Sequence, residues 1–195
     1  KFDLISSFAI FYDVEDPNSF CRDIELLLND DGIWICEFSY LPLMLKNLTF
    51  DQICHEHLMY YTFSVFEKIL INNKLKVIDI KMNEINGGSI EIICAKKTSK
   101  FNVNKNKINK IIKDEKKIST GSYENFNKRI KKIRRLINMF LNLNSKKNII
   151  GYGASTKGNI VLNFCSIKNS QIQEICDGSK KKLSKFTPGS NINII

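Results

Sequence analysis

The alternation of apolar and polar positions predicts an α/β segment at the start of the chain. An apolar, buried strand at 2–5 is followed by a loop and then by a helix that opens at Asp16-Pro17, and residues 33–38 form a second strand that is apolar on both faces. We expect the polar run 29–32 to stop the helix, with Gly32 in the left-handed conformation. A strand, a helix and a strand joined by short loops favour a doubly wound sheet.

The same patterns predict the elements of the remaining chain. We expect a loop at 39–63, a helix at 64–72 with Ser64 as its N-cap, and antiparallel strands at 75–82 and 90–96 around a turn at 86–89. Two basic helices follow at 104–118 and 122–143, separated by residues 120–122. A strand at 148–150, a glycine-rich loop at 151–158, a helix at 159–165 and a strand at 172–176 complete the pattern.

Length and composition narrow the class of protein. The chain has 195 residues, 43% of them hydrophobic, and no apolar run approaches the ~18 residues that span a membrane. It begins with Lys1 and has an apolar run at each end, so we expect a fragment of a longer protein. The six cysteines form no CxxC pair and have no zinc-finger spacing, as expected for buried thiols in the cytoplasm.

The charge is unevenly distributed. Residues 1–100 carry 10 Lys and Arg against 15 Asp and Glu, whereas residues 101–195 carry 20 against 5. A basic half of this kind forms solvated helix faces or faces a phosphorylated ligand. We expect no nucleic-acid partner and no membrane partner, and the sequence leaves the oligomeric state open.

The strongest candidate for chemistry is a short motif that contains the only two histidines. It reads Cys54-His55-Glu56-His57 and is followed by Tyr60 and Tyr61. Histidine exchanges a proton near pH ~6.5, so two imidazoles around a glutamate form a plausible proton-transfer site. No neighbour supplies a clear third metal ligand, so we expect no metal here. A purely structural pair of hydrogen-bonded histidines is the alternative.

Two glycine-rich turns are the other candidates. The loop Gly151-Tyr152-Gly153-Ala154-Ser155-Thr156-Lys157-Gly158 fits neither the dinucleotide fingerprint nor a P-loop. We expect Gly153, Ala154 and Lys157 to contact phosphate or substrate, with a tight structural turn or NAD binding, using Asp177 as the ribose acid, as alternatives. The turn Gly87-Gly88-Ser89 joins two strands and also permits close approach of a ligand to the backbone.

Taken in order, these motifs resemble the nucleotide-sugar C-methyltransferase family. The resemblance covers nearly the whole chain, and its most specific parts are the HEH motif and the GYGAxxKG loop. Many relatives have a tyrosine where this chain has Cys54. The resemblance implies an α/β fold made of the second half of a class I methyltransferase Rossmann-like sheet (1–100, with the catalytic loop), a helical bridge (101–145) and a truncated C-terminal Rossmann-like substrate domain (146–195).

The family's chemistry supplies expectations for the site. The resemblance implies an S-adenosylmethionine-dependent enzyme that methylates carbon 3 of a 4-keto-deoxysugar nucleotide. His57 matches the family's proposed base, with Glu56 and His55 as supporting catalytic residues. The expected substrate contacts are Cys54, Tyr60, Tyr61, Gly87, Gly88, Ser89, Gly153, Ala154 and Lys157.

The resemblance also implies that parts of the enzyme lie outside this chain. The main S-adenosylmethionine loop and the zinc-binding module belong to the N-terminal part that the chain lacks. Within the present chain, the expected cofactor contacts are Phe8 and Ala9. There are two rival interpretations. One is an NAD-dependent oxidoreductase or epimerase that uses the GYGASTKG loop, and the other is a non-catalytic fragment that binds a nucleotide sugar.

Overall fold

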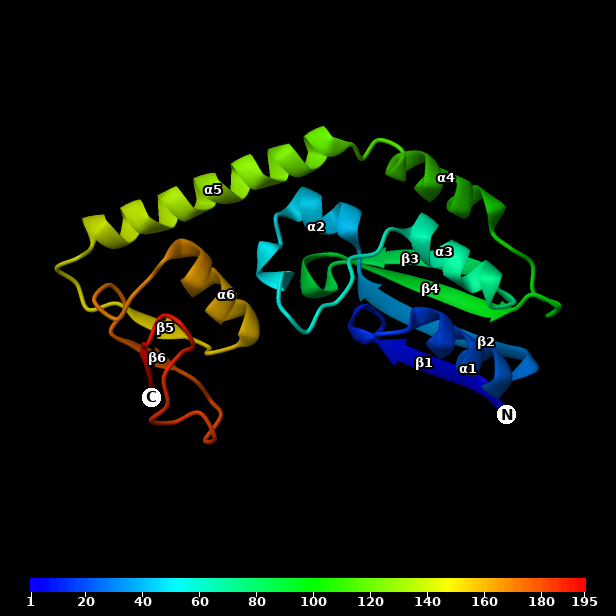
Figure 1. Ribbon diagram of the computed structural model, residues 1–195, viewed down its shortest axis with the longest axis horizontal. Coiled ribbons are helices and arrows are strands. Elements are labelled where there is room, and N and C mark those ends of the chain that lie inside the picture. Colours follow the sequence, from blue (N-terminus) through cyan, green and yellow to red (C-terminus); the bar gives the residue numbers. More distant parts are fainter. The chain divides into compact units, whose positions relative to one another are not determined.

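The computed structural model describes residues 1–195 as two compact units (Figure 1). Unit 1 comprises residues 1–49 and 56–124, and unit 2 comprises residues 50–55 and 125–195. The chain is a mixed α/β protein, as the sequence predicts. The division into 1–100, 101–145 and 146–195 stays a prediction, and the segment predicted as a bridge contributes to both units.

Unit 1 is built on a four-stranded mixed sheet. Its strands are β1 (Phe2–Phe8), β2 (Leu28–Ser39), β3 (Leu75–Asn83) and β4 (Ser89–Lys96), in the order β1-β2-β4-β3. β1 and β2 are parallel, and β4 runs antiparallel to both of its neighbours, β2 and β3. The predicted antiparallel pair at the glycine turn is therefore confirmed.

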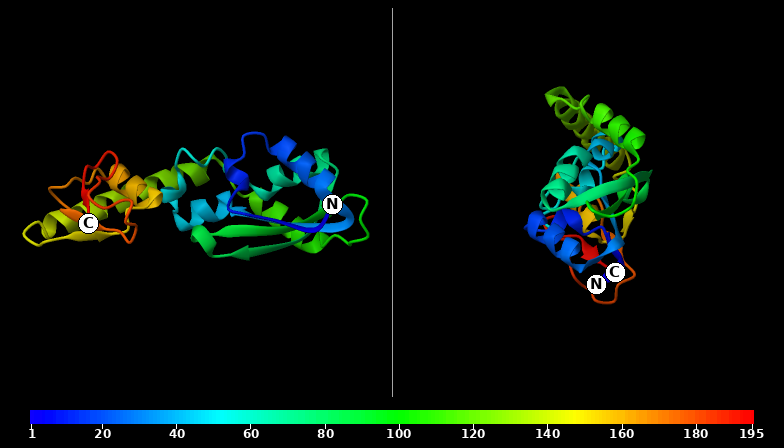
Figure 2. Two further views of the ribbon diagram at one scale, coloured as in Figure 1. Left: turned by 90° about the horizontal axis from the view of Figure 1, so that it is seen from below. Right: turned by 90° about the vertical axis from the view of Figure 1, so that its right-hand side faces the viewer.

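One face of this sheet forms an aromatic core. Alternate residues of β2 point to this face, where α1 (Pro17–Leu27) and α3 (Phe63–Asn72) cover it (Figure 2). Phe11, in the short turn Phe11–Asp13 after β1, is fully buried at the centre of the cluster. Its ring lies between 4.8 and 6.2 Å from five other rings, which belong to Phe20, Trp34, Phe38, Tyr61 and Phe66.

Two predictions for the first third of the chain are wrong in detail. β1 exists but is not buried, because it is an edge strand with Phe2 and Leu4 more than half exposed. Gly32 does not end α1 in a left-handed conformation. α1 ends at Leu27, and Gly32 lies inside β2 at an irregularity in the pairing, where a Cβ atom would stand 2.7 Å from the Phe2 carbonyl oxygen.

The predicted loop at 39–63 contains a helix. α2 (Leu41–Asn47) carries a proline in its first turn, and a second short turn spans Phe50–Gln52. α3 begins one residue earlier than predicted, and its N-cap is Thr62, whose hydroxyl accepts from the Val65 N–H at 3.4 Å. Ser64 therefore lies within the helix and is not the cap.

Two helices follow β4. α4 (Lys105–Glu115) packs against α3 and β3, and α5 (Thr120–Leu143) starts at the Thr-Gly-Ser sequence that was predicted to separate the helices. The separation falls instead at residues 116–119.

Unit 2 is a smaller α/β unit. Its parallel sheet has the order β5 (Ile150–Tyr152), β6 (Glu174–Cys176) and β7 (Asn193–Ile194), the last of which was not predicted. α6 (Thr156–Cys165) starts three residues earlier than predicted because Ser155 caps it, accepting from the Gly158 N–H at 3.1 Å. The segment 50–55 belongs to this unit, where the Phe50 and Phe164 rings lie 4.8 Å apart.

None of the helices combines the length and the apolar character that crossing a lipid bilayer requires.

Candidate functional site

The carboxyl edge of the parallel strands in unit 1 collects several polar side chains. The turn Phe11–Asp13 follows β1 at this edge, and Tyr40 follows β2. Ala9, the residue directly after β1, has a left-handed φ of 56°, and its N–H donates to the Glu37 carbonyl oxygen at 3.0 Å. Ligands of α/β sheets bind outside this edge, so it is where a site is expected.

His57 lies against this edge. The centroids of its ring and the Tyr12 ring are 4.3 Å apart, with 48° between the ring planes. The Met59 N–H also donates to the Tyr12 carbonyl oxygen at 3.1 Å, which fixes the backbone beside the histidine. The imidazole is partly exposed. It is therefore supported on one face and still accessible.

Two carboxylates accompany the imidazole. Asp13 is exposed, but desolvation by the surrounding protein is the main influence on its pKa and raises it, whereas the charge of His57 lowers that pKa and the charge of Glu56 raises it. Asp13, Glu56 and His57 are thus close enough to interact electrostatically. Sequence reasoning missed Asp13, although it lies in the short turn that follows β1 at the edge where ligands of α/β sheets bind.

The other residues around the HEH motif differ in exposure. His55 and Glu56 are exposed, and Cys54 and Tyr60 are partly exposed. Tyr61 is only 4% exposed and its hydroxyl is buried in the core without a hydrogen-bond partner. Burial raises the pKa of this phenol to about 12. Tyr61 is therefore a core residue in this structure, and its contact with a substrate stays a prediction.

The motif also spans the division between the units. His55 belongs to the segment of unit 2, whereas Glu56 and His57 belong to unit 1. The three predicted catalytic residues are therefore neighbours in sequence that belong to different compact units.

The glycine turn at 87–89 is shaped by packing within unit 1. Gly87 and Gly88 have φ values of 81° and 131°, and Cβ atoms at these positions would stand 2.2 Å from Thr49 and 2.6 Å from Leu43. Ser89 is fully buried, and its hydroxyl donates to the Ile85 carbonyl oxygen. These contacts explain the residues without a ligand. Gly88 nevertheless lines a cavity of about 360 Å³ with other residues, namely Leu43, Lys46, Asn47, Met82, Asn83 and Glu84.

The loop at 151–158 is held from within unit 2. The Asp177 carboxylate accepts from the Ala154 N–H at 2.8 Å and from the Ser179 N–H at 2.9 Å. The ammonium of Lys182 donates to Asp177 and to the Ala154 carbonyl oxygen at 3.0 and 2.9 Å. These bonds hold the pKa of Asp177 below its usual value. The Asp177 carboxylate thus already accepts three hydrogen bonds, with which a ribose hydroxyl would have to compete.

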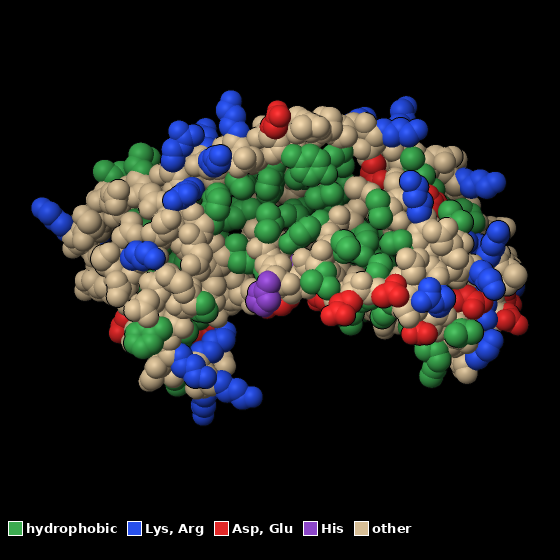
Figure 3. Space-filling model, viewed as in Figure 1, with side chains coloured by type: hydrophobic (Ala, Val, Ile, Leu, Met, Phe, Trp, Pro, Cys, Tyr) green, Lys and Arg blue, Asp and Glu red, His purple; other side chains and the backbone are tan.

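Part of this loop remains open to a ligand. A Cβ atom at Gly153 would meet nothing within 4 Å, and Lys157 is partly exposed in the first turn of α6. Lysine and arginine side chains also gather on the loop after β6, where residues 179–185 contain four lysines (Figure 3). This end of unit 2 therefore presents positive charge beside an open glycine.

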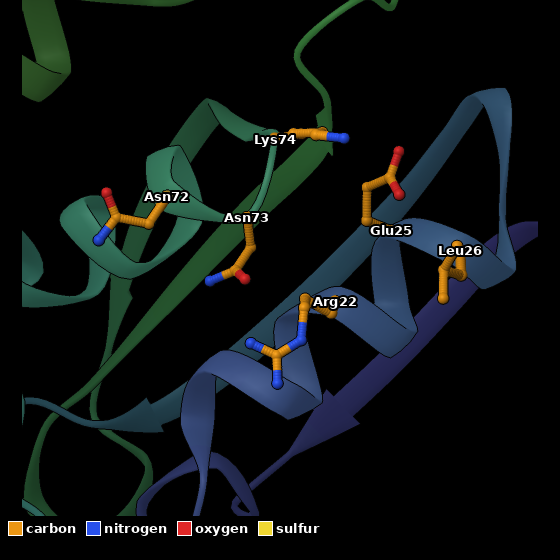
Figure 4. Close-up of a pocket in the computed structure, with 6 residues that line it drawn as sticks. All are labelled: Arg22, Glu25, Leu26, Asn72, Asn73 and Lys74. Atoms are coloured by element: carbon orange, nitrogen blue, oxygen red, sulfur yellow. The ribbon is translucent and has the colours of Figure 1, made fainter.

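A separate cavity of about 220 Å³ lies between the last turns of α1 and α3 (Figure 4). Two of its charged lining residues are already paired, since Arg22 contacts Asp16 and Glu25 contacts Lys96, each at 3.8 Å. None of the predicted site residues lines it.

No group of three or more His, Cys, Asp or Glu side chains is arranged to hold a metal ion.

Two further buried carboxylates, Glu37 and Glu115, are not among the residues that the sequence analysis singles out. Glu37 is 4% exposed, and its carboxylate accepts from the Asn83 side chain at 3.0 Å. An acid inside the apolar strand 33–38 was a usable signal. Glu115 is 9% exposed and lies in a predicted basic helix, where nothing in the local pattern distinguishes it.

A curated C-methyltransferase has a sequence similar to that of this chain. C-methyltransferase NovU of Streptomyces niveus is 28% identical over 189 residues, which cover 94% of this chain and 45% of NovU. The chain thus spans less than half the length of this curated relative.

Solved structures give weaker likenesses. A Haloferax volcanii complex of the Trm112 methyltransferase activator with a methyltransferase has a TM-score of 0.42 and 12% identity, covering 48% of this chain and 54% of that one. The magnesium protoporphyrin IX methyltransferase of Synechocystis PCC 6803 has a TM-score of 0.38 and 14% identity, covering 49% and 45%. Scores this low establish no relationship.

The match to a protein family is decisive. The model of the family described as the C-methyltransferase C-terminal domain matches residues 84–195, which is more than half of the chain. The match starts in unit 1, before β4, and continues to residue 195. It therefore includes all of unit 2 except the segment 50–55. The chain belongs to the C-methyltransferase family.

Proposed function

We propose that this chain forms part of an S-adenosylmethionine-dependent enzyme that methylates carbon 3 of a 4-keto-deoxysugar nucleotide. The observation that carries the proposal is the placement of His57 at the carboxyl edge of the sheet. Its imidazole is partly exposed, lies against the tilted Tyr12 ring and is close enough to Asp13 to interact electrostatically. A general base needs this combination of access and support.

His57 is the proposed base. A hydrogen on the carbon next to a ketone is acidic because the electron pair left behind spreads onto the ketone oxygen. His57 takes this proton from carbon 3 and becomes positively charged. The neighbouring carboxylates of Asp13 and Glu56 stabilise that charge, in the way an acid supports a catalytic histidine. Base catalysis of this kind contributes about 10²–10⁴-fold to the rate.

The cofactor supplies the other half of the reaction. When bound, S-adenosylmethionine provides an electrophilic methyl group that the carbanion accepts. Phe8 and Ala9 are the residues of this chain that would contact the cofactor, because Phe8 is 49% exposed at the end of β1 and Ala9 directly follows it. An exposed aromatic ring packs well against a flat adenine.

The sugar nucleotide is the proposed ligand of unit 2. Its diphosphate carries negative charge, which the first turn of α6 and the ammonium of Lys157 attract. Gly153 leaves room for close approach. The Ala154 N–H already donates to Asp177, so the predicted contact through Ala154 would not involve this group.

The proposal is tested by methyl transfer in the full-length enzyme that contains this chain. We expect His57→Asn to lower kcat by at least about 10²-fold, because the base is lost. Circular dichroism should be unchanged, since the ring is partly exposed. His55→Asn is the matched control, and it should keep a larger share of the activity. Full activity of His57→Asn would refute the proposed role.

A further inference from the structure

Glu115 is a buried carboxylate with an unusual set of partners. It is the last residue of α4 and only 9% exposed. Its Oε1 accepts from the Tyr40 hydroxyl at 2.7 Å and from the Phe63 N–H at 2.5 Å. Its Oε2 accepts from the Ser64 N–H at 2.9 Å and from the Ser64 hydroxyl. All four hydrogen bonds join residues more than 50 positions apart.

The position of Glu115 is explained by α3 and not by its own helix. A negative charge at the C-terminus of α4 opposes the helix dipole. Phe63 and Ser64 are the first two residues of α3, where backbone N–H groups lack acceptors within the helix. The carboxylate satisfies these two groups, and the positive end of the α3 dipole stabilises its charge.

The residues that bond to Glu115 lie at the two ends of one segment of the chain, residues 41–62. Tyr40 directly precedes residues 41–62, and Phe63 directly follows them. The two ends also meet each other, because Tyr40 and Tyr61 form a β-bridge and the Leu41 N–H donates to the Tyr61 carbonyl oxygen at 3.0 Å. Glu115 therefore joins the two ends of the segment 41–62, which carries the HEH motif. We call these joined ends, Tyr40 and residues 61–64, the neck of the segment.

The segment between this neck and His57 is short. His57 is four residues from Tyr61, and the Met59 N–H ties the same segment to the Tyr12 carbonyl oxygen. Movement of the neck would therefore move the imidazole relative to Tyr12 and Asp13. A misplacement of about 1 Å of a catalytic group costs up to roughly 10²-fold in rate.

We propose that Glu115 is a positioning residue for His57. It touches no substrate and acts by fixing the neck from which the histidine segment departs. The catalytic part of this proposal rests on the proposed function, because positioning affects turnover only if His57 is the base. The structural part, that Glu115 sets the place of the imidazole, stands by itself.

The test compares Glu115→Gln with Asp114→Asn in this chain. Glutamine keeps one acceptor oxygen but places an NH₂ group where the other must accept. Asp114 is the adjacent exposed acid, whose partner is Lys117 at 2.6 Å, so it controls for loss of charge from α4. The direct readout is the NMR spectrum of the imidazoles, in which only two histidines contribute and the Tyr12 ring shifts the signal of His57.

We expect Glu115→Gln to move and broaden the His57 signals and to leave those of His55 in place, while Asp114→Asn changes neither. In the full-length enzyme, kcat should fall about 10- to 100-fold with a smaller change in KM. Unmoved His57 signals in folded Glu115→Gln would overturn the proposal. Moved signals with unchanged kcat would confirm the positioning and contradict the role of His57 as base.

A second variant covers the case in which Glu115→Gln does not fold. Tyr40→Phe removes one of the four hydrogen bonds and keeps the buried ring. It should shift the His57 signals in the same direction by a smaller amount. An unchanged His57 spectrum in folded Tyr40→Phe, together with an unfolded Glu115→Gln, would reduce Glu115 to a stabilising residue and overturn the proposal.

Discussion

At the scale of single residues, the environment of His57 sets what the site can do. Tyr12 supports one face of the ring, and Asp13 lies in the same short turn as Tyr12. Desolvation raises the pKa of the Asp13 carboxyl, and the charge of the neighbouring His57 opposes this rise. An imidazole that gains a proton during the reaction is stabilised by such a neighbour.

This arrangement predicts a role for Asp13 in turnover. We expect Asp13→Asn to lower kcat about tenfold or more, because the neutral amide no longer stabilises the protonated imidazole. Asp23→Asn, an exposed acid of α1, is the control and should leave kcat unchanged. Steady-state methyl transfer by the full-length enzyme measures both. Equal rates for the two variants would remove Asp13 from the mechanism.

At the scale of elements, the turn between β3 and β4 depends on its glycines. Gly88 has a φ of 131°, and a methyl group there would collide with Leu43 of α2. We expect Gly88→Ala to lower the free energy of unfolding by about 1–3 kcal/mol.

The chain offers a matched control for this substitution. Gly121 lies in the first turn of α5, where a methyl group would meet only the Ser119 hydroxyl at 3.6 Å. Gly121→Ala should leave stability unchanged or raise it by at most about 1 kcal/mol. Urea unfolding followed by the fluorescence of Trp34 compares the two. An unchanged free energy of unfolding in Gly88→Ala would contradict this prediction, because it would mean that α2 moves to make room for the methyl group.

The loop between β5 and α6 predicts a pH dependence of unit 2. The pKa of Asp177 is lowered by its bonds to Ser179, Lys182 and Ala154. A carboxylate with a lowered pKa stabilises the fold above its unfolded pKa of about 3.9, and this stability is lost as the pH falls through the folded pKa.

Hydrogen exchange measures this effect. Amide protection of peptides from β5 and β6 should fall as the pH drops below about 5, and Asp177→Asn should flatten this dependence. Peptides from β1 and β2, which lie in unit 1, serve as the internal control. An equal pH dependence in Asp177→Asn and the unmodified protein would show that other groups control it.

The sequence predicts most elements because their patterns are local. The helices at 17–27 and 63–72 and the antiparallel strands carry clear periodicity, and the structure confirms them. α2 was missed because its short apolar run lies in a segment dominated by the HEH motif. The cap of α3 was misplaced because Ser64 bonds to Glu115, a contact over 51 positions that no local pattern contains.

At the scale of the whole molecule, the family is established but the chain covers only part of a relative. It spans 45% of NovU, so the activity, the substrate and the cofactor of the complete enzyme are proposals for this protein. The candidate site residues are divided between the two compact units, with His57 in one and Lys157 in the other.

The most direct measurement is exchange of the hydrogen on carbon 3 of a 4-keto-deoxysugar nucleotide in D₂O, catalysed by the full-length enzyme and followed by NMR. The account predicts that the unmodified enzyme and the His55→Asn variant exchange this hydrogen faster than the buffer does, and that His57→Asn does not. Exchange by His57→Asn at the unmodified rate would contradict the account.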